Sequence, residues 1–297
     1  MDATLLDTLR LSRKQRHITP ELGRPSRHGI RLVELPLATV RVRDVGEGDQ
    51  TVIVVPDPPN VIEHHGDLFA RLSDKARVVC FEAPGFGFSV PKRGFDFSLE
   101  HQADTVIALL AALRVDRCAL AFSCVSVYAA LEVARRLPEK VTRLMLMQAP
   151  AFEQERAWAK RVDFKGLLQT PVLGQALTAA APRFIARRWY QAACGDPLQA
   201  PLFEVDALDA FNRGAAFPLA SGLQAVFGRP SPTFAPVKQK AMVLWGAADR
   251  THRRTDKRSV LAYAPDAAYL EFADAGHFPD LEQPERFASL LLELLAS

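Results

Sequence analysis

Residues 120–127 read LAFSCVSV, and residues 128–134 continue as YAALEVA. The first run is apolar throughout, and the second places apolar residues at the three- and four-residue spacing of a helix. The stretch therefore predicts a buried strand that turns sharply into a helix. A side chain held at such a turn stands above the end of the strand, where it can meet a substrate. Ser123 and Cys124 are the reactive side chains at the turn.

The composition is typical of a soluble globular protein. The 297 residues are 48% hydrophobic and 24% charged, with a formal net charge of +3. That charge is too small to predict binding to nucleic acid or to an acidic membrane surface. No apolar run approaches the roughly 18 residues that a membrane span requires. Residues 1–7, MDATLLD, lack the basic start and apolar core of a secretory signal, so a cytoplasmic location is expected.

The four cysteines show neither a CxxC pair nor the spacing of a metal site. We therefore expect free thiols, no metal site and no cofactor. Cys80 and Cys118 fall within or beside predicted strands and are expected in the core. Cys194 follows a predicted cap helix and has no predicted role, which leaves Cys124 as the thiol with a chemical context.

Strands alternate with helices along most of the chain. The predicted strands are Arg31–Glu34, Ala38–Arg43, Thr51–Val55, Arg77–Phe81, Arg117–Phe122, Val141–Met147, Met242–Trp245 and Ala268–Phe272. Helices are predicted at Val61–Leu72, at Leu99–Leu113, from the opening turn to Arg136, and at Gln283–Leu295. This alternation predicts an α/β fold with a mostly parallel central sheet flanked by helices.

Residues 151–236 interrupt the alternation with helical stretches broken by prolines and with no clear strand. We interpret them as a helical cap over the carboxyl edge of the sheet. The predicted organisation is then an N-terminal amphipathic helix and linker in residues 1–29, a core formed by residues 30–150 and 237–297, and the cap between the two parts of the core.

Three further segments, one before the opening turn and two after it, give the chain an order of motifs that resembles the capped branch of the α/β-hydrolase superfamily. Residues 82–89, EAPGFGFS, are similar to that family's acidic-x-Pro-Gly-x-Gly-x-Ser turn. Residues 245–249, WGAAD, resemble the strand end that carries the acid of the catalytic triad, and residues 275–285, AGHFPDLEQPE, resemble the loop that carries the histidine. The resemblance implies the α/β-hydrolase fold with Asp249 and His277 as two triad members.

The third triad member is placed by register. The family's elbow and following helix align without gaps on residues 120–141 and match Ala130-Leu131, Ala134 and the segment 138–141. This alignment puts Cys124 where the family has its serine. Ser123 as the nucleophile would require one inserted residue, which would turn the helix by roughly 100° and misplace its buried face. A third alternative is that the chain has no nucleophile.

Cysteine is chemically suited to this place. The N-terminal end of a helix and a neighbouring imidazole both favour the thiolate. In the implied triad His277 accepts the thiol proton, while Asp249 holds the imidazole in the required tautomer. Each of these residues has an ordinary structural explanation when taken alone, as a core thiol, a solvated histidine or a helix cap. Their joint order within the family's motifs is what favours a catalytic role.

The chain also departs from the family pattern. The glycines that flank the nucleophile are replaced by Phe122 and Ser126, and Phe122 demands space from its neighbours. At the oxyanion hole Pro58 occupies the place of a residue that donates its N–H, which a proline lacks. The N–H of Val125 remains as one donor, and the side chain of Asn60 is a candidate for the other.

A thioester intermediate is well suited to passing an acyl group to an acceptor. The sequence therefore favours a cofactor-free acyl-transfer enzyme of the thioesterase, acyltransferase or cyclase type. Its expected partner is a small acyl or thioester substrate, including one bound to CoA or to a carrier protein. Arg183, Arg187 and Arg188 share a predicted helix that could meet such an anionic group, although a solvated face is the simpler explanation. The alternatives are a catalytically silent binding protein or complex subunit, and a plain cysteine or serine esterase. The oligomeric state is not predicted.

Overall fold

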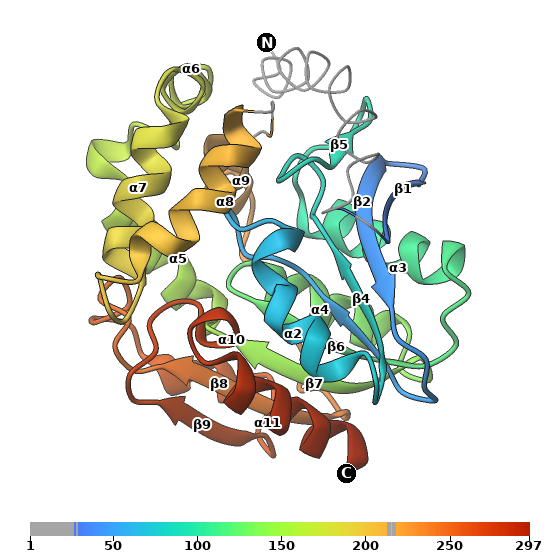
Figure 1. Ribbon diagram of the computed structural model, residues 1–297. Coiled ribbons are helices and arrows are strands. Elements are labelled where there is room, and N and C mark those ends of the chain that lie inside the picture. Colours follow the sequence, from blue (N-terminus) through green and yellow to red (C-terminus); the bar gives the residue numbers. More distant parts are fainter. Residues whose placement is uncertain (1–26, 28, 213–214, 216–217) are drawn as a thin grey trace.

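A nine-stranded mixed sheet runs through the molecule (Figure 1). The computed structural model describes residues 27, 29–212, 215 and 218–297, so the helix predicted near the N-terminus lies outside the described residues. The strands are β1 (Ile30–Glu34), β2 (Ala38–Val45), β3 (Thr51–Val54), β4 (Arg77–Phe81), β5 (Val90–Pro91), β6 (Cys118–Ser123), β7 (Val141–Met147), β8 (Lys240–Gly246) and β9 (Ala268–Phe272). Three of the predicted strands, β4, β7 and β9, have the predicted bounds, whereas the two-residue β5 was not predicted.

The order of the strands across the sheet is β1-β2-β4-β3-β6-β7-β8-β9, with β5 paired to β2. The six strands β4, β3, β6, β7, β8 and β9 are parallel to one another. At the β4 side, β2 pairs antiparallel to β4, and β1 and β5 pair antiparallel to β2. The predicted α/β fold with a mostly parallel sheet is therefore confirmed.

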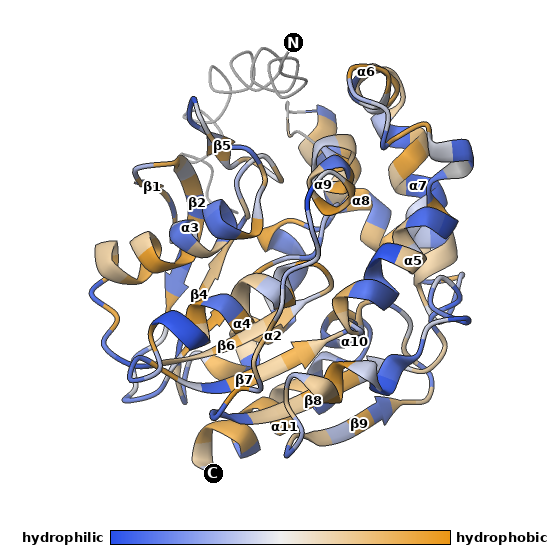
Figure 2. Ribbon diagram, turned by 180° about the vertical axis from the view of Figure 1, so that it is seen from behind, coloured by the Kyte–Doolittle hydropathy of each residue, from blue (hydrophilic) through white to orange (hydrophobic). Residues whose placement is uncertain are grey.

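Helices cover both faces of the sheet (Figure 1). One face packs against α3 (Leu99–Ala112) and α4 (Ser126–Arg136), and the other against α2 (Gly66–Leu72) and α11 (Pro284–Ala296). Strand β6 shows how the sequence produces these two layers. Leu120 and Phe122 point to the α3–α4 face, whereas Ala119 and Ala121 point to the α2–α11 face, as the two-residue period of a strand requires. Figure 2 shows the central strands in mostly hydrophobic colours.

Phe122 is accommodated by the core. Its side chain is 1% exposed, and its ring meets that of Phe81 edge-on at a centroid separation of 6.3 Å. Phe122 was expected to demand space from its neighbours, and the core on the α3–α4 face provides that space.

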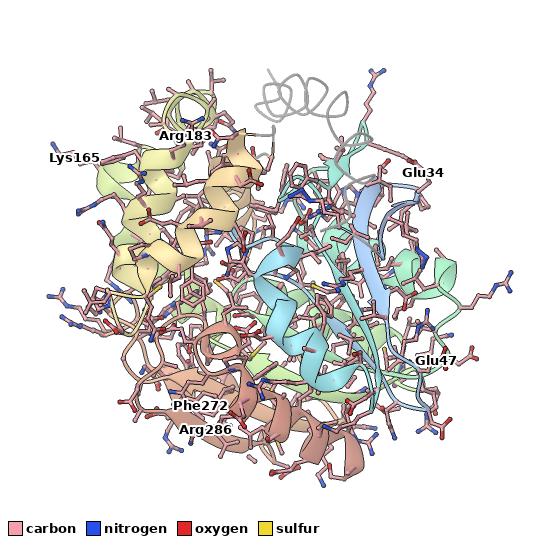
Figure 3. The ribbon with its side chains drawn as sticks, in the orientation of Figure 1. Glu34, Glu47, Lys165, Arg183, Phe272 and Arg286 are labelled. Carbon is pink, nitrogen blue, oxygen red and sulfur yellow. The ribbon has the colours of Figure 1, made fainter. Side chains whose placement is uncertain are left out.

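On the opposite side of the sheet, Arg286 of α11 lies over the ring of Phe272 at the end of β9, 4.1 Å from its centroid (Figure 3).

Between β7 and β8 the described chain is helical and gathers at one end of the sheet (Figure 1). Its helices are α5 (Phe152–Val162), a short 3₁₀ turn (Phe164–Gly166), α6 (Leu173–Ala180), α7 (Pro182–Ala193), α8 (Ala200–Asn212) and α9 (Leu219–Phe227). Two more 3₁₀ turns (Ile62–His65 and Lys257–Ala262) and the short α10 (Pro279–Glu282) complete the elements. Among the described residues, no helix is both long and apolar enough to span a membrane.

Glu82, at the start of the predicted glycine-rich turn, has a structural role. One carboxylate oxygen accepts a hydrogen bond from Arg41 at 2.8 Å, and the other accepts one from the amide of Phe88 at 2.5 Å. Arg41 is 1% exposed and also pairs with Glu63 at 2.6 Å. Gly87 completes the turn because a Cβ at this position would lie 2.2 Å from Cδ of Glu82. The network ties β2 and β4 to the loop beside the candidate site.

Candidate active site

Cys124 occupies the turn between β6 and α4 in a left-handed backbone conformation, with φ of 53°. This conformation is unfavourable for a residue with a Cβ, and it persists where the surrounding structure determines it. Here the amide of Cys124 donates to the carbonyl of Met147 at 2.9 Å, and the hydroxyl of Ser126 donates to the carbonyl of Ser123 at 2.5 Å. The turn is therefore fixed from both sides, as a nucleophile elbow requires.

The turn presents Cys124 rather than Ser123 to an interior cavity that residues of α5, α7 and α9 also line. Cys124 lines the cavity there, and Ser123 is not among the described residues that do so. The hydroxyl of Ser123 is buried and has no hydrogen-bond partner in the described chain. The geometry thus agrees with the alignment that puts Cys124 at the elbow position.

The site lies where the direction of the chain across the sheet reverses. From β3 the chain passes to its neighbour β4 on one side, whereas β6 pairs with β3 on the other side. In an open α/β sheet such a reversal leaves a crevice at the carboxyl ends of the two strands. Asp57 and Pro58 follow β3, and Cys124 follows β6, so all three residues line this crevice.

His277 and Asp249 form the buried pair that the family resemblance implies. Nδ1 of His277 lies 2.7 Å from Oδ2 of Asp249, and neither side chain has measurable exposure. Burial favours the neutral acid, but the facing His277 outweighs it and lowers the pKa of Asp249 to about 2. An ionised carboxylate only accepts hydrogen bonds, so Nδ1 carries the proton and Nε2 faces the other way.

Asp249 is itself held in place by hydrogen bonds. Gln148 donates its side-chain amide to Oδ2 at 2.8 Å, and Thr251 donates both its backbone N–H and its hydroxyl to Oδ1 at 2.8 Å. Gln148 in turn accepts a hydrogen bond from the amide of Gly246 at 2.6 Å. These contacts leave the carboxylate one orientation, which fixes the imidazole.

Nε2 of His277 faces Cys124 and Asp57. The sulfur, this nitrogen and a carboxylate oxygen of Asp57 all lie within 4.8 Å of one another. Nε2 is 3.1 Å from Oδ2 of Asp57, yet the direction of the contact does not suit a hydrogen bond, and both atoms are buried without such a partner in the described chain. The structure therefore brings the three predicted triad residues together and adds Asp57, which the sequence analysis did not predict as a site side chain.

The resting state of Cys124 differs from the expected thiolate. Burial, followed by the negative charges of Asp57 and Glu155, raises the pKa of the Cys124 thiol, and His277 only partly opposes them. Burial would lower the pKa of His277, but the carboxylates, Asp249 foremost, raise it well above its ordinary value. Cys124 is therefore a neutral thiol that must lose its proton during reaction.

The predicted oxyanion residues occupy different environments. Val125 is 42% exposed and lines the cavity, and its amide makes no hydrogen bond to another described residue. Pro58 also lines the cavity but has no N–H to donate. Asn60 is buried, and its side-chain oxygen accepts a hydrogen bond from Tyr190 at 2.7 Å. Asn60 is not among the described residues that line the cavity.

Aromatic rings surround His277. Trp158 and His252 stack in parallel with a centroid separation of 4.7 Å, His252 stacks on His277 at 5.4 Å, and Trp189 meets His277 edge-on at 5.0 Å. Burial, then the positive charge of His277, lowers the pKa of His252 to about 3, so His252 is neutral. The rings pack around His277, whose side chain has no measurable exposure.

Glu155 of α5 adds a further buried carboxyl group. It has no measurable exposure, and both of its oxygens lack a hydrogen-bond partner in the described chain. Burial raises the pKa of Glu155 to about 8, and the charges of Asp57 and Asp249 also favour its neutral form. In the sequence Glu155 looks like an ordinary acidic residue in the first turn of a helix, which is why sequence reasoning missed it.

The cavity has a volume of about 1150 Å³. Its lining is largely apolar and includes the aromatic side chains of Phe152, Trp158 and Trp189. Tyr190 and Phe203 pack instead against Phe278. The size and lining suit an apolar substrate of moderate length.

The three arginines of α7 have different surroundings. Arg188 lines the cavity and is exposed, whereas Arg187 pairs with Glu204 at 3.3 Å and Arg183 hydrogen-bonds Asn212.

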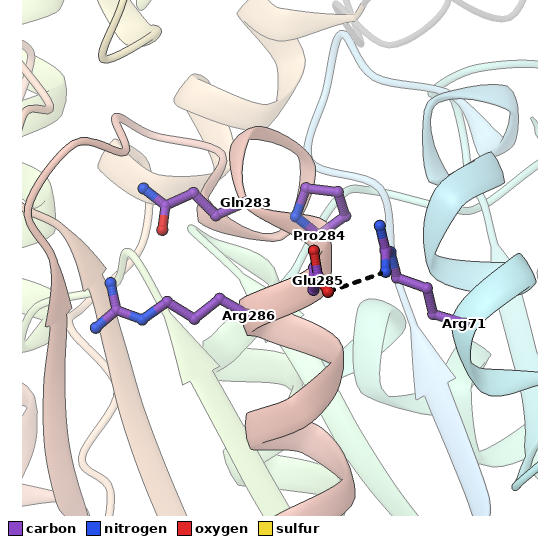
Figure 4. Close-up of a pocket in the computed structure, with 5 residues that line it drawn as sticks. All are labelled: Arg71, Gln283, Pro284, Glu285 and Arg286. Carbon is purple, nitrogen blue, oxygen red and sulfur yellow. Dashed lines mark ion pairs between the residues drawn. The ribbon is translucent and has the colours of Figure 1, made fainter.

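A second, smaller pocket of about 460 Å³ lies on the outer surface between Arg71 and α11 (Figure 4). Its ion pair, Arg71 with Glu285 at 3.8 Å, is exposed, and none of the candidate catalytic residues lines the pocket.

Comparison with known proteins agrees with the architecture. Over 110 residues this chain is 31% identical to a 2-hydroxy-6-oxo-2,4-heptadienoate hydrolase from Pseudomonas putida. The aligned stretch covers 36% of this chain and 40% of that protein. The chain thus spans two fifths of the length of this curated relative. Epoxide hydrolase A from Mycobacterium thermoresistibile superposes with a TM-score of 0.72 at 17% identity, covering 90% of this chain and 98% of that chain.

A thermophilic esterase from Thermogutta terrifontis superposes with a TM-score of 0.67 at 22% identity, covering 90% of this chain and 98% of that chain. At such identities these structures share the fold alone, and they carry different chemistries on it. The sequence model of the alpha/beta hydrolase family matches residues 62–290, which include the elbow, Asp249 and His277. The chain therefore belongs to the alpha/beta hydrolase family.

Proposed function

We propose that this chain is a cofactor-free acyl-transfer enzyme of the thioesterase, acyltransferase or cyclase type, in which Cys124 carries the acyl group as a thioester. The observation that carries the proposal is the placement of Cys124 in a left-handed turn beside His277, whose other nitrogen is held by Asp249 at 2.7 Å. A nucleophile, a base and a group that orients the base are the parts that covalent acyl transfer needs.

Because the pKa of His277 is raised, the base in the acylation step is the fraction of molecules in which Nε2 has given up its proton to solvent. There His277 takes the thiol proton on Nε2 as the sulfur attacks the carbonyl carbon. The S–C bond forms, and the π electrons of the carbonyl move to its oxygen. Collapse of this intermediate expels the leaving group, which receives the proton from His277. Because the pKa of the Cys124 thiol is raised by burial, removal of the proton is coupled to attack and no resting ion pair is needed.

In the second step an acceptor nucleophile gives its proton to His277 and attacks the thioester carbonyl. The S–C bond then breaks, and the sulfur recovers the proton. The apolar cavity suits the acyl chain, and the exposed Arg188 at its lining suits an anionic group on the donor, such as the phosphates of CoA or of a carrier-protein arm. These features favour transfer between apolar acyl substrates.

The oxyanion has one backbone donor in this proposal, the N–H of Val125, because Pro58 has none. Loss of one such donor lowers the rate by on the order of 10²–10³ where the charge on the oxygen is fully developed. A thioester or another activated acyl donor needs less of this stabilisation than an amide. The single donor therefore also favours activated acyl substrates.

Intact-protein mass spectrometry after exposure to a series of acyl thioesters tests the proposal. We expect a single acyl adduct on the wild type and on Ser123→Ala, and none on Cys124→Ala. The three proteins should give the same circular dichroism spectrum. The proposal would be contradicted by an adduct that persists on Cys124→Ala. It would also be contradicted if the wild type formed no adduct with an acyl thioester of any chain length in the series.

A catalytically silent binding protein is the second candidate. The missing donor at Pro58 and the raised pKa of the Cys124 thiol favour it. It predicts that acyl compounds bind in the cavity without forming an adduct, and that iodoacetamide modifies Cys124 with the pH profile of a buried, unactivated thiol. Equal alkylation rates in the wild type and in His277→Gln would support this candidate, whereas a slower rate in His277→Gln would exclude it.

A further inference from the structure

We propose that Asp57, Cys124 and His277 form a binding site for a thiophilic divalent cation of the zinc class. Imidazole nitrogen, thiolate sulfur and carboxylate oxygen are the donors that Zn²⁺ takes in proteins, and three protein ligands with one open position is the arrangement of its catalytic sites. The ligands come from three separate segments, after β3, after β6 and after β9, so cysteine spacing alone could not indicate the site.

The ligand atoms are close together and two of them have no other partner. Nε2 of His277 and Oδ2 of Asp57 are 3.1 Å apart and buried without hydrogen bonds in the described chain. Two ligand atoms at Zn²⁺ distances in a tetrahedral site are separated by about 3.4 Å. The sulfur lies within 4.8 Å of both atoms, so a contraction on the order of 1 Å completes the set.

The surroundings supply what a metal-binding histidine needs. Nδ1 of His277 bonds the carboxylate of Asp249 at 2.7 Å, and Asp249 is fixed by Gln148 and Thr251. Such a carboxylate orients the ring and makes its free nitrogen a better ligand. Asp57 and Cys124 both line the cavity, so the fourth position faces space that a water molecule or a substrate atom can enter.

On binding, the sulfur gives up its proton to solvent, and so does Nε2 of His277 where it carries one. The freed electron pairs then form the Zn–S and Zn–N bonds.

A second group of three, Asp249, His252 and His277, is a weaker candidate within the described chain. Its shared nitrogen is already bonded to Asp249, and Nδ1 of His252 lies 3.1 Å from the hydroxyl of Thr255. A cation there would have to break these contacts, whereas at Asp57 it would replace the contacts that the three ligands make with one another.

Titration of the chelator-treated full chain with Zn²⁺ and, separately, with Co²⁺ tests the site. We expect one high-affinity equivalent by calorimetry, a sulfur-to-cobalt charge-transfer band, and protection of Cys124 from iodoacetamide. Cys124→Ser should lose the band, and Asp249→Asn should weaken Zn²⁺ binding by about 10–100-fold. Asp57→Asn should weaken it at least as much, while Asp266→Asn and Cys118→Ala, which alter an exposed acid and a core thiol, should not.

Equal Zn²⁺ affinity in the wild type and Asp57→Asn, or a Co²⁺ spectrum without a sulfur band, would overturn the inference. Inhibition of acylation by Zn²⁺ is a consequence that rests on the proposed function, because a metal-bound sulfur cannot attack a carbonyl. The two proposals fail separately. Acyl adducts are measured in chelator, where no cation is needed, and the cobalt spectrum is measured without any acyl substrate.

Discussion

Two carboxyl groups near His277 have opposite environments. Asp249 accepts hydrogen bonds from three groups besides His277, whereas Glu155 has none among the described residues. The pKa of Asp249 is lowered to about 2 and that of Glu155 is raised to about 8. Asp249 is thus ionised and suited to orient a base, and Glu155 is neutral in mildly acidic solution.

Asp249→Asn should lower the acylation rate by about 10³–10⁴-fold, because an amide at this place stabilises the wrong tautomer of the imidazole and leaves no charge to support its protonated form. Rapid-mixing measurements with a chromogenic acyl donor report this rate. Thr251→Val removes one hydrogen bond to the same carboxylate and should reduce the rate far less. A decrease smaller than tenfold for Asp249→Asn would show that His277 does not act as the base.

Glu155→Gln should change how stability depends on pH. The folded state raises the pKa of this carboxyl from 4.5 to about 8, so the folded state holds the proton more tightly than the unfolded chain. The wild type should therefore lose stability relative to Glu155→Gln as pH rises from about 4.5 to 8, by on the order of a few kcal/mol in total.

Urea unfolding of the wild type and Glu155→Gln at several pH values measures this difference. Comparing the two proteins cancels the titration of all other groups. A difference in unfolding free energy that stays constant between pH 5 and pH 8 would mean that Glu155 is solvated in solution. The prediction would be contradicted if the unfolding free energy of Glu155→Gln exceeded that of the wild type by more at low pH than at pH 8.

At the scale of elements, the strand–turn–helix unit concentrates strain on one residue. Cys124 adopts φ of 53°, a region that glycine enters without a Cβ clash. Cys124→Gly should therefore be more stable than Cys124→Ala by about 1 kcal/mol. At Ala129, inside α4, the order reverses, since glycine in a helix interior destabilises by about 1 kcal/mol. Chemical denaturation of the three variants checks both signs, and a more stable Cys124→Ala would refute the account of the turn.

The elements themselves were largely predictable, and the reason is local. Strands such as β3, with the sequence TVIV, are continuous β-branched runs whose residues are all buried, so pattern and burial coincide. The two residues of β5 are too few to form a pattern, and they became a strand only because β2 lies beside them. The accommodation of Phe122 depended on the position of Phe81 in the neighbouring part of the sheet, which no local pattern contains.

The site was predictable as far as its family motifs extend. Cys124, His277 and Asp249 each occur in a recognisable segment, and the structure places them together. The family motif after β3 concerns a backbone N–H at the position of Pro58 and gives no role to the side chain before it, so the motif did not predict Asp57. Gln148, Glu155 and His252 contribute only through tertiary packing. Whether Cys124 acts as the nucleophile stays a prediction for the acylation experiment.

At the scale of the whole molecule, the antiparallel edge of the sheet is joined to the parallel part through a buried ion pair. Arg41 of β2 reaches Glu82, directly after β4, and Glu63 in the 3₁₀ turn Ile62–His65 that follows β3. Glu82→Ala should lower the unfolding free energy by about 3 kcal/mol or more, because it leaves buried donors without a partner.

Glu285→Ala is the matched control for this prediction. Its ion pair with Arg71 is 3.8 Å long and the Glu285 side chain is 80% exposed, so its loss should change stability by less than about 1 kcal/mol. Urea denaturation at one pH compares the two variants. Equal destabilisation by both would show that the buried network carries no more stability than a surface contact.

Burial of the cysteines has a consequence for handling the protein. All four thiols are free and buried, and Cys124, with 4% exposure, opens only onto an apolar cavity. Charged thiol-counting reagents should therefore find almost none in the native chain and four after denaturation. Disulfide-linked aggregates, where they arise during storage, would then report chains that have unfolded, because the folded molecule offers no sulfur to a second copy.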